Sequence, residues 1–282
     1  MTYFGFLGIF VVIPIILLWS LNIADARRGK LLPSGLRSWS SWIIVAAHAL
    51  IALVYTTPWD NYLVATRVWW YEPSLVTGVV IGYVPIEEYT FFVLQPLLTG
   101  AWLLMMARHL PLSTAPYTGN APRFRQRVTF LIGLVWLVAI VILLAGWQPG
   151  TYLALLLAWA LPPVMLQTAF GADILWRHRR LILMTIIPMT LYLAAADKLA
   201  ISSGTWTINP QQSLNIFLLG RLPIEEFLFF LMTNVLIAVG VTLVASVESK
   251  ARAAHYVTLA SKWLQRRSAK TPPGINTKGD FA

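Results

Sequence analysis

The chain alternates long apolar stretches with short polar loops, and this pattern predicts a membrane protein. Seven stretches approach or exceed the roughly 20 residues that an α-helix needs to cross a bilayer. They lie near residues 3–21, 39–57, 75–107, 128–146, 152–170, 181–196 and 222–245. The third is long enough for its first part to be a separate interfacial segment, broken at Pro85. We therefore expect an all-α, polytopic fold with seven transmembrane helices.

Composition agrees with this prediction. Hydrophobic residues make up 58% of the chain and charged residues 11%, and the mean hydropathy is +0.69. Soluble domains are about half apolar and about a quarter charged. A disordered chain is excluded and a soluble enzyme is disfavoured. The chain has no cysteine, which excludes disulfides and thiolate metal sites.

The basic residues predict the orientation. Of the 21 Lys and Arg residues, 18 follow the first, third, fifth and seventh stretches, and only Arg67, Lys198 and Arg221 lie on the other side. The positive-inside rule then places the N-terminus outside and the C-terminus inside, in the cell membrane. The net charge of +10 is explained by this topology, so no nucleic-acid partner is expected. Because no basic residue precedes the first stretch, we expect a retained span and not a signal peptide.

The sequence also contains an internal repeat. The segment Val-Pro-Ile-Glu-Glu-Tyr-Thr-Phe-Phe at 84–92 matches Leu-Pro-Ile-Glu-Glu-Phe-Leu-Phe-Phe at 222–230. We therefore expect a parallel 3+1+3 arrangement, in which spans one to three recur as spans five to seven. The expected units are residues 1–110 (first repeat), 111–150 (linker loop and extra helix), 151–246 (second repeat) and 247–282 (basic cytoplasmic tail). The tail as far as Arg267 predicts a helix on the inner leaflet.

The two Glu-Glu pairs are the sharpest chemical feature. One interpretation is that acids simply favour the positive start of a helix. However, an ionisable group within a span costs roughly 2.5–3.5 kcal/mol, so it is a functional candidate by default. Adjacent helical residues point about 100° apart, so the two members of each pair face differently. The second members share a stripe with aromatic and polar residues. We predict that Glu88 and Glu226 carry the chemistry. Glu87 and Glu225 are predicted to orient or cap them, and all four glutamates are included in the predicted catalytic set.

Other candidates lie at the same predicted level. Asp60 and Asp197 are either solvated loop acids or further catalytic groups. The nearby aromatics are either an interfacial belt or a set of ring faces that stabilises a carbocation. Arg67 and Arg221 are predicted counter-ions. The candidate substrate-binding residues are Trp59, Trp69, Trp70, Tyr89, Phe92, Gln95, Trp206 and Phe230.

Metal and nucleotide sites are not indicated. His48 lies mid-span and is expected to be a core residue, while His109, His178 and His255 are expected to be solvated. No spacing suggests a metal site, and no Gly-rich nucleotide fingerprint occurs. We therefore expect neither a metal nor a cofactor.

These residues resemble the membrane-integral lycopene β-cyclases of the heterodimer type. The resemblance rests on Pro58-Trp59-Asp60, on 68–71 (Val-Trp-Trp-Tyr), and on the doubled Pro-Ile-Glu-Glu motif, and it spans roughly residues 1–246. Members of this family consist of two small polypeptides or of both units fused, and this chain is similar to the fused form. The second copy departs from the pattern, with Ala195-Ala196 before its aspartate and a lone Trp206.

The resemblance implies a non-redox isomerisation. An acid protonates the terminal double bond of lycopene, a neighbouring double bond attacks, and a base removes a ring proton, which gives γ-carotene and then β-carotene. Paired carboxyl groups suit this acid/base chemistry. The implied partner is a membrane-dissolved carotenoid. A longer carotenoid, a different ring product and a homo-oligomer stay open.

Two other functional classes fit seven spans. A small 3+1+3 transporter should have polar residues lining a path at mid-membrane depth. A retinal protein needs a lysine midway along the seventh span, and 222–245 contains none.

Overall fold

The structure is a computed structural model that describes residues 1–111 and 117–268. Seven of its helical segments are long and apolar enough to cross a membrane, which confirms the predicted number of spans. These segments are Tyr3–Arg27, Ser34–Ala65, Ile86–His109, Ala121–Leu144, Gln148–Arg177, Arg179–Ser202 and Ile224–Ala245. The predicted tail beyond residue 268 lies outside the described residues.

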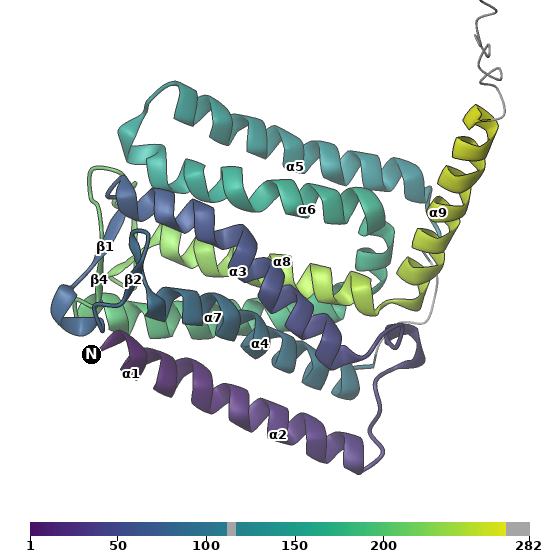
Figure 1. The fold of residues 1–282 in the computed structure, drawn as a ribbon, viewed down its shortest axis with the longest axis horizontal. Helices are drawn as coiled ribbons and strands as arrows, with labels where there is room; N and C mark the ends of the chain where they lie inside the picture. Colours follow the sequence, from purple (N-terminus) through teal and green to yellow (C-terminus); the bar gives the residue numbers. More distant parts are fainter. Residues whose placement is uncertain (112–116, 269–282) are drawn as a thin grey trace, which may run out of the picture.

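The seven membrane-spanning segments form one bundle along a roughly common direction, and the last helix leaves the bundle at a steep angle (Figure 1). The first span consists of α1 (Tyr3–Leu7), a π-helical segment (Gly8–Val12) and α2 (Ile13–Arg27). The remaining helices are α3 (Ser41–Ala65), α4 (Ile86–His109), α5 (Ala121–Leu144), α6 (Thr151–Arg177), α7 (Arg179–Ser202), α8 (Ile224–Ala245) and α9 (Val247–Ser268). Short 3₁₀ turns cover Ser34–Leu36, Pro73–Leu75 and Gln148–Gly150.

The helices differ strongly in burial. In the most apolar window of α4, 61% of the residues are buried, against 6% for α5, which lies on the outside of α6. Helix α8 contacts α3, α4, α6 and α7, so α4 and α8 form the centre of the bundle. The central helices are therefore the ones that carry the two Glu-Glu pairs.

Each of these central helices is preceded by a short hairpin. Strands β2 (Val80–Ile81) and β3 (Val84–Pro85) pair before α4, and β5 (Phe217–Leu218) and β6 (Leu222–Pro223) pair before α8. Proline cannot donate a ladder hydrogen bond but tolerates a helix start. Accordingly, the helix of the third apolar stretch begins directly after Pro85, as the break in that stretch predicts.

A further strand pair joins distant parts of the chain. Strand β1 (Trp69–Tyr71) pairs antiparallel with β4 (Trp206–Ile208), with Trp70 opposite Thr207 and Tyr71 opposite Trp206. The pair lies at the end of the bundle where α4 and α8 begin (Figure 1). It holds the segment after α3 against the segment after α7.

Aromatic donors compensate for several prolines inside the helices. A proline cannot donate to the carbonyl four residues earlier, and in lipid such a group needs another partner. Four of these carbonyls accept a hydrogen bond from an aromatic side chain of another helix. The pairs are Tyr192 with Phe10 (2.9 Å, before Pro14), Trp136 with Ala158 (3.2 Å, before Pro162), Tyr55 with Trp159 (2.9 Å, before Pro163) and Trp102 with Met184 (2.9 Å, before Pro188). The helices that contain these prolines are thereby joined to their neighbours.

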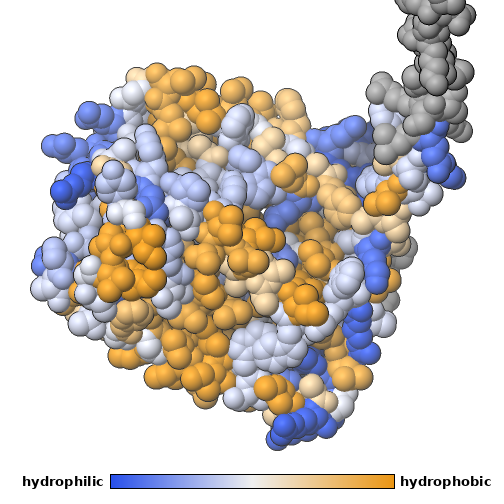
Figure 2. Space-filling model, viewed as in Figure 1, coloured by the Kyte–Doolittle hydropathy of each residue, from blue (hydrophilic) through white to orange (hydrophobic). Residues whose placement is uncertain are grey.

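The surface agrees with a membrane location. Figure 2 shows hydrophobic side chains across the middle of the bundle, with hydrophilic groups gathered towards its two ends. Many large apolar side chains are exposed there, including Leu50 (62%) and Phe130 (65%). Exposure of this kind is unusual for a soluble monomer but suits contact with lipid. The chain is therefore a multi-pass membrane protein.

The predicted environment of one histidine is wrong. His178 was expected to be solvated, but it lies buried at the junction of α6 and α7. Burial and the neighbouring Arg177 lower the pKa of His178 to about 4. The direct connection of the two helices at this residue leaves no loop in which the imidazole could reach solvent.

Candidate active site

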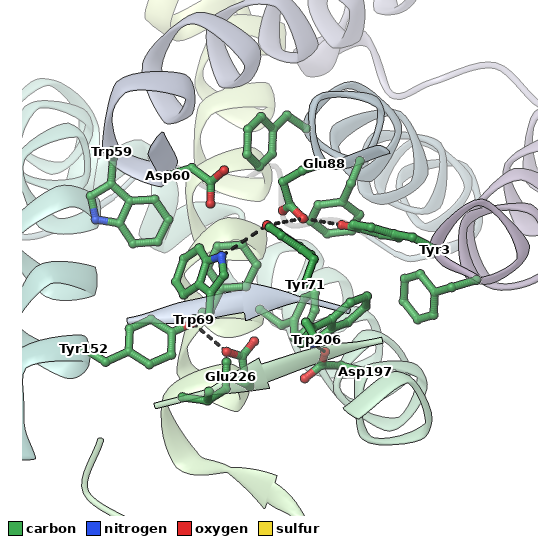
Figure 3. A pocket seen from close by; sticks show the side chains of 16 residues that line it. Tyr3, Trp59, Asp60, Trp69, Tyr71, Glu88, Tyr152, Asp197, Trp206 and Glu226 are labelled. Carbon is green, nitrogen blue, oxygen red and sulfur yellow. Dashed lines mark hydrogen bonds between the residues drawn. The ribbon is translucent and has the colours of Figure 1, made fainter. Parts of the chain in front are cut away.

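A narrow cavity lies at the start of α4 and α8, beneath the β1–β4 pair (Figure 3). Its volume is about 40 Å³. Four carboxyl side chains line it, together with a wall of aromatic rings. The carboxyl groups are those of Asp60, Glu88, Asp197 and Glu226, which come from four different helices. Residues from both copies of the repeated segment thus meet in one place.

Glu88 is held by two phenols. It lies in the first turn of α4 and is 8% exposed. Its Oε2 accepts hydrogen bonds from the hydroxyls of Tyr3 and of Tyr71, the latter at 3.0 Å. Trp69 in turn donates its Nε1–H to the Tyr71 oxygen at 3.1 Å. Helical spacing turns Glu88, but not Glu87, towards these donors.

Tyr71 lies in β1, outside the membrane-spanning helices. Burial and the neighbouring carboxyl groups of Asp60 and Glu88 raise the pKa of its phenol well above the ordinary value. The phenol therefore stays protonated at neutral pH and keeps donating to Glu88. The negative charge at this point, where present, rests on the carboxyl group.

Glu226 has a related but simpler environment. It is 6% exposed in the first turn of α8, and its Oε1 accepts a hydrogen bond from the Tyr152 hydroxyl at 2.7 Å. The Tyr152 ring also packs edge-on against Trp69 at a centroid distance of 5.2 Å. Glu226 thus has one phenolic donor where Glu88 has two.

The two aspartates lie inside helices and not in solvated loops, so the loop-acid interpretation is wrong. Asp60 in α3 is 1% exposed and Asp197 in α7 is 0% exposed. Asp197 Oδ1 accepts a hydrogen bond from Trp206 Nε1 at 3.0 Å. Within the described part of the chain, neither side-chain oxygen of Asp60 has a hydrogen-bond partner. The four acids therefore differ in their hydrogen bonding.

The first members of the Glu-Glu pairs bind loop backbone outside the cavity. Glu87 Oε1 accepts from the backbone N–H of Thr77 at 2.6 Å, and Glu225 Oε1 accepts from that of Leu214, also at 2.6 Å. Neither glutamate lines the cavity. They fix the loops that precede the two hairpins, which agrees with an orienting role but does not bring them to the catalytic set.

Most predicted substrate-binding residues lie at the cavity. Those that line it are Trp59, Trp69, Phe92, Trp206 and Phe230. Trp70 and Tyr89 do not line it. Tyr89 instead donates its hydroxyl to the backbone oxygen of Ile81 at 2.7 Å and accepts from Asn61 at 2.8 Å. Tyr89 therefore stabilises the hairpin before α4.

The predicted counter-ions are not at the site. Arg67 and Arg221 are exposed, and neither belongs to an ion pair among the described residues. Burying a guanidinium group costs free energy unless its geometry with a carboxylate is excellent. Here phenols, an indole and the low polarity of the cavity replace cations, so the counter-ion hypothesis is wrong for this structure.

Of the tyrosines that donate to the two glutamates, Tyr71 was quoted only as part of a motif, and two more were missed in the sequence. Tyr3 and Tyr152 supply hydrogen bonds to Glu88 and Glu226, and Tyr3 packs on Trp206 at 5.0 Å as Tyr152 packs on Trp69. Each tyrosine stands at the start of the first span of its predicted repeat. Comparison of the span starts, and not only of the acidic motif, would have found them.

Below the cavity, Gln95 takes part in a buried polar network. Its Nε2 donates to Asn234 Oδ1 at 3.1 Å, Thr99 donates to the same oxygen at 2.7 Å, and Asn234 donates to Thr190 at 3.2 Å. The network joins α4, α7 and α8. Gln95 therefore takes part in hydrogen bonds between helices and does not line the acid cavity. It does line a neighbouring groove, which is described below.

Comparison with known proteins identifies the family. A family model described as lycopene cyclase matches residues 31–106 and 149–244. The chain belongs to the lycopene cyclase family. It is similar to lycopene beta-cyclases from two strains of Halobacterium salinarum, with 38% identity over 253 residues, which are 89% of this chain and 99% of each relative. It also resembles a bifunctional lycopene cyclase/phytoene synthase of Aspergillus oryzae, with 34% identity over 200 residues, which are 71% of this chain and 34% of that protein. No solved structure matches.

Proposed function

We propose that this chain is an enzyme that cyclises the linear ends of lycopene into β-ionone rings; two of its relatives are named lycopene beta-cyclase. The single observation that carries the proposal is the meeting of four buried carboxyl groups in one aromatic cavity that lacks a cation among its lining residues. The family membership favours this function over a transporter.

The cavity residues supply what the reaction needs. A carboxyl group in its acid form protonates the terminal C=C bond and leaves a tertiary carbocation. The neighbouring double bond attacks this cation and closes the ring, which moves the positive charge onto a ring carbon. A carboxylate then removes a ring proton, so that one proton is gained and one is lost. General acid and base groups contribute about 10²–10⁴-fold each in such steps.

The hydrogen bonds support a division of labour. A buried charge without a partner is costly, so Asp60 is the group best suited to carry a proton before reaction. Glu88 accepts two phenolic hydrogen bonds, which favour its carboxylate form. Glu226 and Asp197 form the corresponding set on the other side. Ring faces of Trp59, Trp69 and Trp206 are placed to stabilise the cation.

The wider architecture is part of the proposal. A tyrosine–glutamate hydrogen bond (Tyr3 with Glu88, Tyr152 with Glu226) and a buried aspartate occur on each side of the cavity, which supports a parallel 3+1+3 repeat over 1–110 and 151–246. Helix α5 lies between the two blocks that the family model matches, which supports its role as a linker within 111–150. The segment 247–282 is then a basic cytoplasmic tail. We infer a cell-membrane location with the N-terminus outside. A homo-oligomer stays open.

The function is tested in cells that accumulate lycopene. Expression of the chain should convert the pigment to a product of unchanged mass, because the reaction only exchanges a proton. In deuterated water, each ring formed should gain one non-exchangeable deuterium. A product that is lighter by two hydrogens or heavier by one water would contradict the proposal, as would unconverted lycopene in the presence of inserted protein.

A further inference from the structure

An apolar groove continues from the acid cavity along the bundle. It lies between α3 and α6, with α8 as its floor. Its upper compartment, the one next to the acid cavity, has a volume of about 430 Å³. Lining residues include Ala52 and Tyr55 of α3, Leu166 of α6 and Phe229 of α8. The groove shares Phe91, Phe92 and Phe229 with the acid cavity, so these three rings separate the two spaces.

The groove extends towards the basic end of the molecule. A lower compartment, also about 430 Å³, shares His48, Leu166 and Gln167 with the upper one and reaches Lys250 at the start of α9. His48 is thus a groove residue and not only a core residue. A Cβ at Gly240 would lie 2.5 Å from His48 Nε2, so the glycine lets the imidazole lie back against α8.

The length of the groove is that of a membrane-spanning chain. Along α3, the path runs from Asp60 in the acid cavity, past Thr56 and His48 in the groove, to Trp39 just before the helix. The helix from Asp60 to Ser41 covers about 30 Å. The hydrocarbon core of a bilayer is also about 30 Å thick. A long linear hydrocarbon can therefore lie in the groove with one end at the acid cavity and the other at the opposite membrane surface.

The groove is open sideways to lipid, but not next to the acids. Ile51 and Leu166 on its two edges are 60% and 74% exposed. Closer to the cavity, α3 is joined to α6 by Trp59 Nε1, which donates to the Leu155 oxygen at 3.1 Å, and by Tyr55, which donates to the Trp159 oxygen at 2.9 Å. A chain can thus enter from the bilayer in the middle of the groove and slide lengthwise towards the acids.

We propose that this groove binds the polyene chain of the substrate while one end is cyclised; this rests on the proposed function. Aromatic walls and continuity with the carboxyl groups favour a conjugated hydrocarbon over a lipid acyl chain. The end group reaches the acids by displacing Phe91, Phe92 or Phe229, since the cavity itself is narrow. The far end lies about 30 Å away, beyond reach of the four carboxyl groups. The second ring therefore requires release and reversed re-entry of the half-cyclised product.

The absence of cysteine allows a direct test. In a Glu88→Gln/Glu226→Gln background, Leu166→Cys and Val138→Cys each give one reactive thiol in a lipid-exposed position; Val138 on α5 is 58% exposed and lies outside the groove. In vesicles, added lycopene should slow the reaction of Leu166→Cys with a lipid-soluble maleimide at least fivefold and leave Val138→Cys unchanged. Equal rates with and without lycopene at Leu166→Cys would overturn the proposal.

A second measurement uses the colour of the ligand. A polyene in a chiral groove should show induced circular dichroism in the visible range. In the same background Ala52→Trp, which places a bulky indole in the upper compartment, should abolish this signal, whereas Ala46→Trp on an exposed position of α3 outside the groove should keep it. An unchanged signal with Ala52→Trp would contradict the groove. Normal conversion of lycopene by the unsubstituted chain together with either negative result would reject the groove and leave the proposed function standing, whereas lack of conversion would reject the function itself.

Discussion

The buried carboxyl groups at the two ends of the bundle have different partners: basic side chains at one end, and phenols, an indole or no donor at the other. At the basic end, Asp173 accepts hydrogen bonds from Arg252 at 2.6 and 2.9 Å and from Arg125 at 3.3 Å, and Asp25 lies 2.7 Å from His109 and 3.6 Å from Lys30. The acids of the cavity are as deeply buried but have only phenol and indole donors, or none. Cations thus compensate the acids that hold the fold together, whereas the acids of the cavity remain free to exchange protons.

The ion pair between Arg252 and Asp173 at the basic end also holds α9 against the bundle. Arg252 extends from α9 to Asp173 of α6 and also donates to the Phe170 oxygen at 2.8 Å. The hydrogen bond and the charge of Asp173 raise the pKa of Arg252. The α9 helix, predicted to lie on the inner leaflet, is therefore fixed to the bundle at its first turns.

The largest effect is expected at the proposed chemical pair. Glu88→Gln and Glu226→Gln keep the size and polarity of the side chain but remove proton exchange, so turnover of lycopene should fall about 10²–10⁴-fold. Glu72→Gln, at an exposed acid near the same end, is the matched control and should keep full activity. Pigment conversion per inserted protein measures the effect. Normal turnover in the double variant would refute the acid/base assignment.

The two aspartates should differ, because only Asp197 has a hydrogen-bond donor. An asparagine at 197 can still accept from Trp206, whereas Asp60→Asn removes the proposed proton donor. We expect Asp60→Asn to reduce turnover at least tenfold more than Asp197→Asn. The same conversion assay measures both. Equal losses would show that hydrogen bonding does not separate the two sides of the cavity.

At the basic end, Asp173→Asn should lower stability and spare the chemistry. Hydrogen bonds to charged groups contribute about 1.5–3 kcal/mol, so the thermal midpoint in detergent should fall by several degrees. Conversion of lycopene at 25 °C per folded protein should stay near that of the unsubstituted chain. A loss of turnover as large as that of Glu88→Gln would remove the distinction between the two ends.

The smallest effect concerns His178. Its pKa is lowered to about 4 in the folded protein from about 6.5 in an unfolded chain, so the folded state binds fewer protons in this range. Stability should therefore fall as the pH drops from about 6.5 to about 4. His178→Asn removes this titrating group. The stability of the variant should therefore depend less on pH between about 4 and 6.5 than that of the unsubstituted protein. Thermal midpoints of both proteins at pH 4, 5, 6 and 7 measure the difference, and parallel curves would exclude the effect.

Local patterns predicted the spans and the acidic motifs well. Apolar length alone gave seven helices, because a bilayer requires about 20 apolar residues for each crossing. Helical spacing separated Glu88 from Glu87, since neighbouring residues point about 100° apart. The environment of Asp60 was not predictable in this way, because the position of a span end within the bundle depends on its neighbours.

The sequence by itself therefore determined the membrane class, the number of helices and the residue types of the chemistry. Only the tertiary structure decided which of these residues meet. Tyr3 and Glu88 are 85 positions apart, and no local pattern links them. Their contact arises because α1 and α4 start at the same end of the bundle. The exclusion of Arg67 and Arg221, and the groove between α3 and α6, likewise follow from helix packing and from the cost of burying charge, which no stretch of sequence displays alone.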